Sequence, residues 1–234
     1  LLTKAIDQII EGNKNAINTE SLAIYYNTKG VIYSNKDLNP EHSFIKADSL
    51  NSLLPVPNID VTAFSSYFLG EFYWDKKEDL KAKSAYSKII NIQDIPKNFY
   101  SFKSTALNKT FYIEKNTLNK TDSLEAKKSA RKLIEFNEFT NDTINVEYGR
   151  ALQYLNYTES AEQVFLNISS IKEGDNRYDK YTKFRALFLL NLYYYGQIRL
   201  DLKDITNAKK LIKVSEELLS LTKDTDYLES HSTY

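Results

Sequence analysis

Few side chains in this 234-residue chain could do chemistry, and none of them falls in a recognisable catalytic or metal-binding pattern. The two histidines, His42 and His231, lack a second histidine one helical turn away and lie in no H-E-x-x-H arrangement. There is no cysteine, which excludes thiolate zinc sites, cysteine nucleophiles and disulfides. No G-x-G or G-K-[ST] motif is present to cradle a phosphate. We therefore expect the histidines to be ordinary helix-end or terminal residues.

Carboxylates are numerous and offer the remaining route to catalysis. Glu216 with Glu217, or Asp75 with Glu78 and Asp79, could share acid–base work. On amphipathic helices, however, such charges usually form the solvated face. The sequence therefore favours a binding protein over an enzyme, with no metal and no cofactor.

The overall charge and hydropathy exclude two classes of partner for this segment. With 31 Lys+Arg against 31 Asp+Glu, the chain lacks the positive field that draws proteins to nucleic acids. Its strongest apolar stretch, from Ala186 to Tyr195, is about half the ~20 residues that a membrane span needs. The absence of Met and the Leu1-Leu2 start suggest a piece of a longer protein, so either a cytoplasmic or a periplasmic location fits.

The abundance of Asn, Lys, Ile and Tyr is typical of proteins from AT-rich bacterial genomes. Such a composition also produces Asn-x-Ser/Thr triplets by chance, and we favour chance over glycosylation for the five that occur. These triplets begin at Asn108, Asn119, Asn141, Asn156 and Asn167.

The clearest organisation is a repeated pairing of small residues. Four glycines interrupt aromatic-rich stretches with helical periodicity: Gly30, Gly70, Gly149 and Gly196. A glycine inside a helix costs about 1 kcal/mol relative to alanine, so a matching context at four positions calls for a reason. Twelve residues after the last three of them come alanines that open a second amphipathic stretch: Ala82, Ala161 and Ala208. The pattern predicts pairs of helices that approach closely at small side chains.

This spacing resembles the tetratricopeptide repeat (TPR) family, whose unit is a helix-turn-helix. The residues that carry the resemblance are Tyr67, Leu69, Gly70, Tyr73, Ala82, Tyr86, Ile89 and Pro96. The resemblance implies an all-α fold, a right-handed α-solenoid of about five units. We expect these units at 19–54, 60–94, 98–139, 143–172 and 178–222, with 1–12 ending an upstream repeat and 223–234 forming a tail.

Two of the expected units depart from the pattern. In the first, Gly30 is followed by Ser43 and Ala47, which requires one extra residue in the turn. In the third, Asn108 stands in the glycine's place and Ala126 is the small residue of the second helix. Equivalent positions are then 40, 38, 41 and 47 residues apart, longer than the family's ~34.

The resemblance also implies a concave groove lined by the first helix of each unit. The residues it places there are Asn27, Tyr67, Glu71, Trp74, Lys109, Tyr112, Arg150, Tyr154, Tyr193 and Gln197. Aromatic, amide and charged side chains suit an extended peptide with apolar anchors and a carboxylate that Arg150 could hold.

We therefore expect a protein- or peptide-interaction scaffold, of the kind found as the regulatory or sensory TPR domain of a larger bacterial signal-transduction protein. A structural adaptor in a cell-envelope or secretion complex is the alternative, and an enzyme with an unrecognised carboxylate site is a distant third. Homodimer formation is left open.

Overall fold

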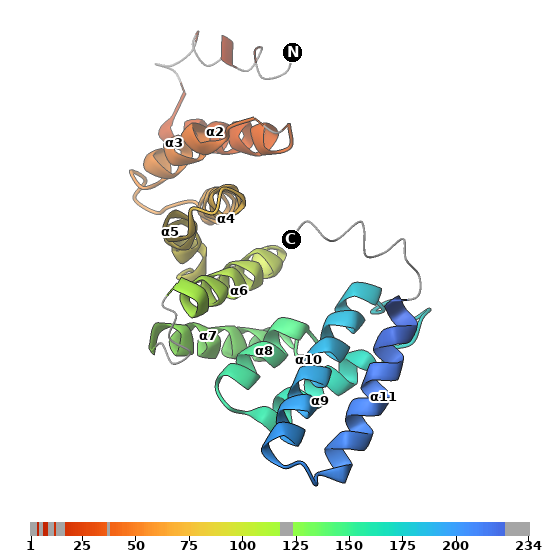
Figure 1. Ribbon diagram of the computed structural model, residues 1–234. Helices are drawn as coiled ribbons and strands as arrows, with labels where there is room; N and C mark the ends of the chain where they lie inside the picture. The colour runs from red at the N-terminus through yellow and green to blue at the C-terminus, as the bar shows by residue number, and fades with distance from the viewer. Residues whose placement is uncertain are drawn as a thin grey trace. The chain divides into compact units, whose positions relative to one another are not determined.

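The computed structural model describes residues 4, 7–8, 12, 17–36, 38–117 and 124–222, and within them the fold is all-α, without a strand (Figure 1). The predicted end of an upstream repeat, the tail and His231 fall almost wholly outside these ranges. The elements are α2 (Thr19–Ser34), α3 (Glu41–Asn51), α4 (Ile59–Asp75), α5 (Asp79–Ile90), a 3₁₀ helix η1 (Lys97–Phe99), α6 (Tyr100–Thr117), α7 (Leu124–Thr140), α8 (Val146–Tyr154), α9 (Thr158–Ser169), α10 (Lys180–Leu200) and α11 (Ile205–Thr222). None of these helices combines the length and apolar composition needed to cross a bilayer.

The chain forms two compact units, Leu1–Ser129 and Ala130–Tyr234, and the division falls inside α7. In the first unit α2 pairs with α3 and α4 with α5, and α6 packs against α4 and α5. In the second unit α8 pairs with α9 and α10 with α11, and α10 also packs against α8 and α9. Both units thus contain helical hairpins, and α2–α3 packs on α4, α4–α5 on α6, and α8–α9 on α10.

Hairpins begin with a recurring start signal. Asn18, Asn58, Asn145 and Asp179 precede α2, α4, α8 and α10, and each side chain accepts a hydrogen bond from a backbone N–H of the first turn. The second helices α3, α5 and α9 have no such side-chain cap. Helix α11 is the exception among the second helices, because Asn207 N–H donates to Asp204 Oδ1 at 2.9 Å at its start.

Three of the four predicted glycines lie where two helices of a hairpin touch. A Cβ added to Gly30 would lie 2.5 Å from a ring carbon of Phe44. The corresponding distances are 2.3 Å from Gly70 to the Tyr86 ring and 2.5 Å from Gly149 to the Phe165 ring. All three rings are buried. The glycines are needed because any side chain there would overlap an aromatic ring of the opposite helix.

The small residues predicted for the second helices are buried, with Ala208 as the exception described below. Ala82, Ala126 and Ala161 are all buried, at 2% exposure or less. In the first hairpin the pairing of Gly30 with Phe44 places Pro40, not Ser43, in the position of Ala82. The turn between α2 and α3 therefore contains no extra residue. Instead, α3 begins at Glu41, close to its contact residue Phe44, whereas α5 begins about one turn further ahead of its contact residue Tyr86.

The predicted register of the last hairpin is wrong. No atom lies within 4 Å of a Cβ built on Gly196, and Ala208 is only partly buried. The contact between α10 and α11 is made instead by Asn191, whose Nδ2 donates to Ser215 Oγ at 2.7 Å. Helix α10 continues nine residues beyond Asn191, whereas α4 continues five beyond Gly70, so Gly196 falls past the contact.

A second recurring bond supports this corrected register. Tyr73 Oη, three residues after Gly70, donates to Glu41 Oε1 of the preceding hairpin at 2.8 Å. Tyr194 Oη, three residues after Asn191, donates to Glu162 Oε1 of the preceding hairpin at 2.7 Å. With Asn191 as the equivalent position, the last spacing becomes 42 residues instead of 47, close to the others.

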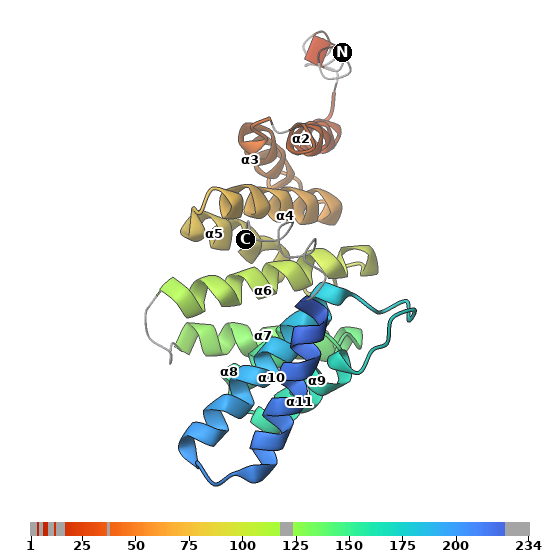
Figure 2. The same cartoon turned by 45° about the vertical axis from the view of Figure 1, so that its right-hand side comes forward.

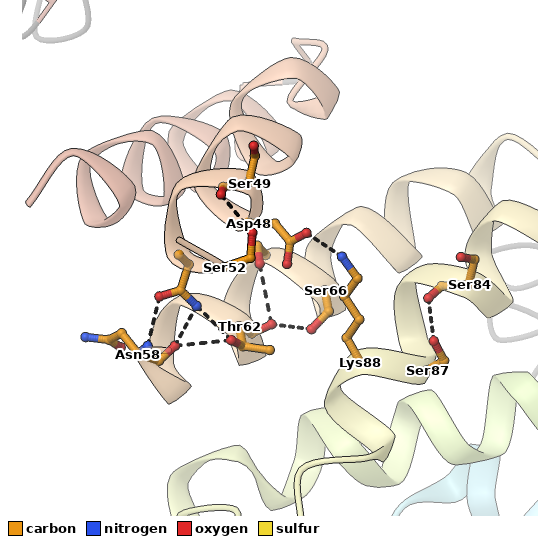
Figure 3. Close-up of polar contacts among 11 residues, drawn as sticks. Asp48, Ser49, Ser52, Asn58, Thr62, Ser66, Ser84, Ser87 and Lys88 are labelled. Carbon is orange, nitrogen blue, oxygen red and sulfur yellow. Dashed lines mark hydrogen bonds and ion pairs between the residues drawn. The ribbon is translucent and has the colours of Figure 1, made fainter. Parts of the chain in front are cut away.

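Buried asparagines join the end of one hairpin to the start of the next. Asn51, 2% exposed, donates to Asn58 O at 3.0 Å and to Thr62 Oγ1 at 2.9 Å, and accepts from Asn58 N–H at 2.8 Å (Figure 3). Asn137, 1% exposed, accepts from Asn145 Nδ2 at 3.0 Å in the second unit. In both places a buried amide near the end of a second helix holds the capping residue of the next first helix.

Candidate functional site

The ten predicted groove residues are divided between the two units. Six lie on α2, α4 and α6 of the first unit: Asn27, Tyr67, Glu71, Trp74, Lys109 and Tyr112. Four lie on α8 and α10 of the second unit: Arg150, Tyr154, Tyr193 and Gln197.

An ion pair joins α4 to α6 in the first unit. Lys109 Nζ lies 2.8 Å from both carboxylate oxygens of Glu71. Tyr86 Oη, from α5, also donates to Glu71 Oε1. Burial of the Tyr86 hydroxyl, together with this hydrogen bond, raises the pKa of Tyr86. Because both charges are partly withdrawn from water and satisfied by each other, the pair fixes the spacing of the two helices.

Aromatic side chains surround this pair. The Trp74 ring meets Tyr112 edge to face, with centroids 5.6 Å apart, and Lys109 Nζ lies 5.0 Å from the Trp74 ring centroid. The Tyr67 ring stacks on Phe102 of α6 with a centroid separation of 4.1 Å. Burial, and then the nearby Glu71 carboxylate, raise the pKa of Tyr67. We call Tyr67, Glu71, Trp74, Lys109 and Tyr112 the α4–α6 face.

The α4–α6 face is suited to holding apolar groups. Tyr112 is 44% exposed, and Tyr67 and Trp74 are partly exposed. The only charges in the face neutralise each other, so a ligand side chain that settles on the rings meets no unpaired ion. A partly exposed Trp and an exposed Tyr beside a satisfied polar centre are typical of the anchor points of protein interfaces.

A hollow opens beside this face. It has a volume of about 410 Å³ and reaches from the turn after α2 to one side of α4. Its lining residues are Ser34, Leu38, Asn39, Pro40, Phe68, Glu71, Phe72, Asp75 and Lys76. Glu71 belongs to both the hollow and the α4–α6 face, so a chain lying over the face has a recess for a side chain next to it.

Asn27 does not line an open surface. It is 8% exposed, and its Oδ1 has no hydrogen-bond partner. The resemblance placed Asn27 at the position of α2 that corresponds to Tyr67 on α4. The short Asn27 side chain is buried at this position, whereas the longer Tyr67 side chain is partly exposed. We therefore exclude Asn27 from the candidate site.

In the second unit Arg150 belongs to a cluster that the sequence did not reveal. Glu147 accepts from Arg150 Nη1 at 3.3 Å and from Arg185 of α10. The Arg185 guanidinium also lies 5.7 Å from the Tyr181 ring centroid. Two guanidinium groups share one carboxylate, so the three side chains together carry a net positive charge that suits a second carboxylate. The sequence signal was weak, because Glu147 and Arg185 are 38 positions apart and adjoin only through the packing of α10 on α8.

Tyr193 and Gln197 were predicted to line the groove by counting from Gly196, which does not lie at the contact between α10 and α11. Both are partly exposed on α10. The positions equivalent to Tyr67 and Trp74, counted from Asn191, are Phe188 and Tyr195, which are 46% and 53% exposed. These two residues replace Tyr193 and Gln197 as the face of α10 that corresponds to the α4 part of the α4–α6 face.

Neither His42 nor the carboxylate candidates form a metal-binding cluster within the described residues. His42 is exposed in the first turn of α3. In the described part of the chain, no three His, Asp or Glu side chains are grouped closely enough to hold a metal ion. Comparisons with protein-family models, with characterised proteins and with solved structures give no match.

Proposed function

We propose that the chain is a right-handed α-solenoid of five TPR-like hairpins. The support is the recurrence of the same contacts at corresponding places. A glycine faces a buried ring in three hairpins, and a tyrosine binds a glutamate of the preceding hairpin in both units. Asparagine bridges join consecutive hairpins in both units as well. Repetition of local contacts is the property that defines a stack of similar units.

On this architecture we propose that the chain binds a segment of another protein rather than catalysing a reaction. The observation that carries the proposal is the α4–α6 face, where Trp74 and Tyr112 are presented to solvent over the neutralised pair of Glu71 and Lys109. The segment would be extended or helical, with an aromatic or large aliphatic anchor for this face. In the second unit, Arg150 and Arg185 would by themselves suit a carboxylate group. Binding of a protein segment in this way would suit a regulatory or sensory module of a larger bacterial signalling protein.

Trp74 provides a direct test, because it is the only tryptophan in the chain. A panel of synthetic peptides that vary in apolar anchor and in carboxylate number is titrated, and the change in tryptophan fluorescence is recorded. A peptide with an aromatic anchor should shift the emission, and Tyr112→Ala should weaken its binding by about 2 kcal/mol, the cost expected for a true anchor.

The matched control is Tyr157→Ala, which removes an exposed tyrosine of the second unit. This variant should bind as the parent does. If no peptide of the panel changes the emission, or if both variants bind equally well, the α4–α6 face is not the binding site.

A further inference from the structure

Helix α4 lies between α2 and α6 and packs on both of them (Figure 2). Tyr67 and Trp74 are on the side of α4 that contacts α6. Phe68 and Phe72 are on the next side of the helix, which lines the hollow beside the turn after α2. Glu71 belongs to both the α4–α6 face and the hollow. A ligand held by the α4–α6 face therefore lies next to the hollow.

The walls of this hollow are largely apolar. Phe68 and Phe72 form the wall from α4, and Leu38 and Pro40 form the wall from the turn between α2 and α3. Leu38 is 51% exposed, and both phenylalanines are partly exposed. Such walls suit the methylene chain of a long side chain, which packs its stem on apolar groups and keeps its charged end near water.

The hollow also contains a carboxylate that is not satisfied by the chain. The Glu71 carboxylate is satisfied by Lys109 and Tyr86. Asp75, one helical turn later, is exposed and lines the hollow. Within the described residues, no ion pair or hydrogen bond is made by the Asp75 carboxylate. It is therefore free to accept a charge-assisted hydrogen bond from a cationic ligand group.

The chain's own Lys76 indicates which group the hollow accommodates. Lys76 follows α4 directly and lines the hollow, and its Nζ lies 4.1 Å from the ring centroid of Phe72. An ammonium group at this distance is attracted by the negative face of the ring. Because the Lys76 side chain is exposed at the end of the helix, it can leave the ring without disturbing the fold.

We propose that the hollow binds a lysine side chain of the protein segment that the α4–α6 face holds. The inference rests on the proposed function, because it adds a second residue to the same ligand. The lysine stem packs on Phe72 and Leu38. Its ammonium replaces that of Lys76 over the Phe72 ring and donates to the Asp75 carboxylate.

Lys76 is thus an internal competitor of the ligand. While its ammonium is on the Phe72 ring, it offsets the charge of Asp75. Once Lys76 is displaced, the negative charge of Asp75 is uncompensated and complements the ammonium of the ligand. The proposal therefore makes opposite predictions for the removal of these two charges.

Pairs of synthetic peptides test the proposal on the full chain. Each peptide has one phenylalanine anchor and, at one of the three positions on either side of it, lysine or norleucine. Norleucine keeps the methylene stem and lacks the ammonium. Titration calorimetry should show that, at the productive spacing, the parent binds the lysine peptide about fivefold more tightly than the norleucine peptide. High salt should reduce this preference.

Asp75→Asn should abolish the preference for lysine, whereas Lys76→Gln should increase it because the competing ammonium is gone. The matched control is Asp60→Asn, which removes an exposed carboxylate in the first turn of the same helix, away from the hollow lining. This variant should keep the parent's preference. Circular dichroism confirms that each variant is folded.

The result also separates this inference from the proposed function. Equal affinities for the lysine and norleucine peptides at every spacing, with binding that Tyr112→Ala weakens, overturn the lysine site and leave the α4–α6 face as an anchor site. A preference for lysine that survives Asp75→Asn overturns the assignment to this hollow. If no peptide binds the parent, the proposed function and the lysine site are both wrong.

Discussion

At the scale of single residues, the glycines of the first helices differ in what faces their Cα atoms. Gly70 lies against the buried ring of Tyr86, whereas Gly196 faces open space. Gly70→Ala should lower the free energy of unfolding by about 1–3 kcal/mol, because the ring has no room to move. Gly196→Ala should raise it by up to about 1 kcal/mol through helix propensity. Urea denaturation at low protein concentration measures both changes, and equal effects would contradict the assigned contacts.

Ionisation of Glu162 provides a pH-dependent contribution to stability. Burial alone would raise the pKa of Glu162, but hydrogen bonds from Lys210 and Tyr194 outweigh it, so the pKa is lowered from its usual 4.5. Because the pKa is lower in the folded state, the stabilisation is present above pH 4.5 and is lost as the pH falls through the folded-state pKa.

Glu162→Gln should therefore reduce stability at neutral pH and flatten the loss of stability below pH 4.5. Glu159→Gln, at an exposed carboxylate on the same helix, is the control and should follow the parent curve. Thermal unfolding followed by circular dichroism across the acid range measures both variants. Parallel curves for Glu162→Gln and the parent would show that the bonds to Tyr194 and Lys210 contribute no pH dependence.

At the scale of helices, the alanines of the second helices should respond according to their burial. Ala82→Leu and Ala161→Leu should each lower the free energy of unfolding by about 1–3 kcal/mol, because the side chain must enter a closed contact between helices. Ala208→Leu should change it by less than about 0.5 kcal/mol, since Ala208 is partly exposed beyond the contact of α10 with α11. Urea denaturation of the three variants measures these changes. A large loss of stability for Ala208→Leu would support the register in which Ala208 pairs with Gly196.

The sequence predicted the helices and the pairing of α2 with α3, α4 with α5 and α8 with α9, because the contacts within these hairpins are local and periodic. Gly70 and Ala82 are on the two helices of one hairpin, joined by a short turn, so their spacing carries the geometry. The same spacing predicted the wrong register at Gly196 and Ala208, because α10 is longer and contacts α11 through Asn191 and Ser215 instead. A hydrogen-bonded Asn–Ser pair can join two helices of a hairpin in place of a glycine that faces an aromatic ring. A sequence pattern that counts only small residues does not detect this difference.

The candidate site was predictable only in part, for the same physical reason. The family resemblance put Trp74 and Tyr112 among the expected groove residues, and the packing of α4 against α6 brings their rings into contact. The sequence gives no indication that Lys109 would bind Glu71, or that Glu147 would join Arg150 to Arg185. Those pairs depend on how one hairpin sits on the next, which the loops between hairpins determine.

At the scale of the whole molecule, the helical hairpins within each compact unit depend on their immediate neighbours. Helix α4 contacts elements of the hairpin before it and the helix after it, and α10 contacts α8, α9 and α11. In a stack of such units, stability is a sum of local terms and nearest-neighbour terms. A local lesion should then spread through adjacent hairpins and fade with separation along the chain.

Hydrogen exchange of Ala161→Leu tests this expectation. The substitution overpacks the contact of α8 with α9, and α10 packs on both of these helices, so amide exchange should accelerate throughout α8–α11. Helices α2–α5, in the other compact unit, should exchange as in the parent. Gly70→Ala should give the reverse pattern, with faster exchange in α2–α6 and parent-like exchange in α10 and α11. Uniform acceleration along the chain by either variant would show that the protein unfolds as one cooperative block, and the nearest-neighbour account of its stability would fail.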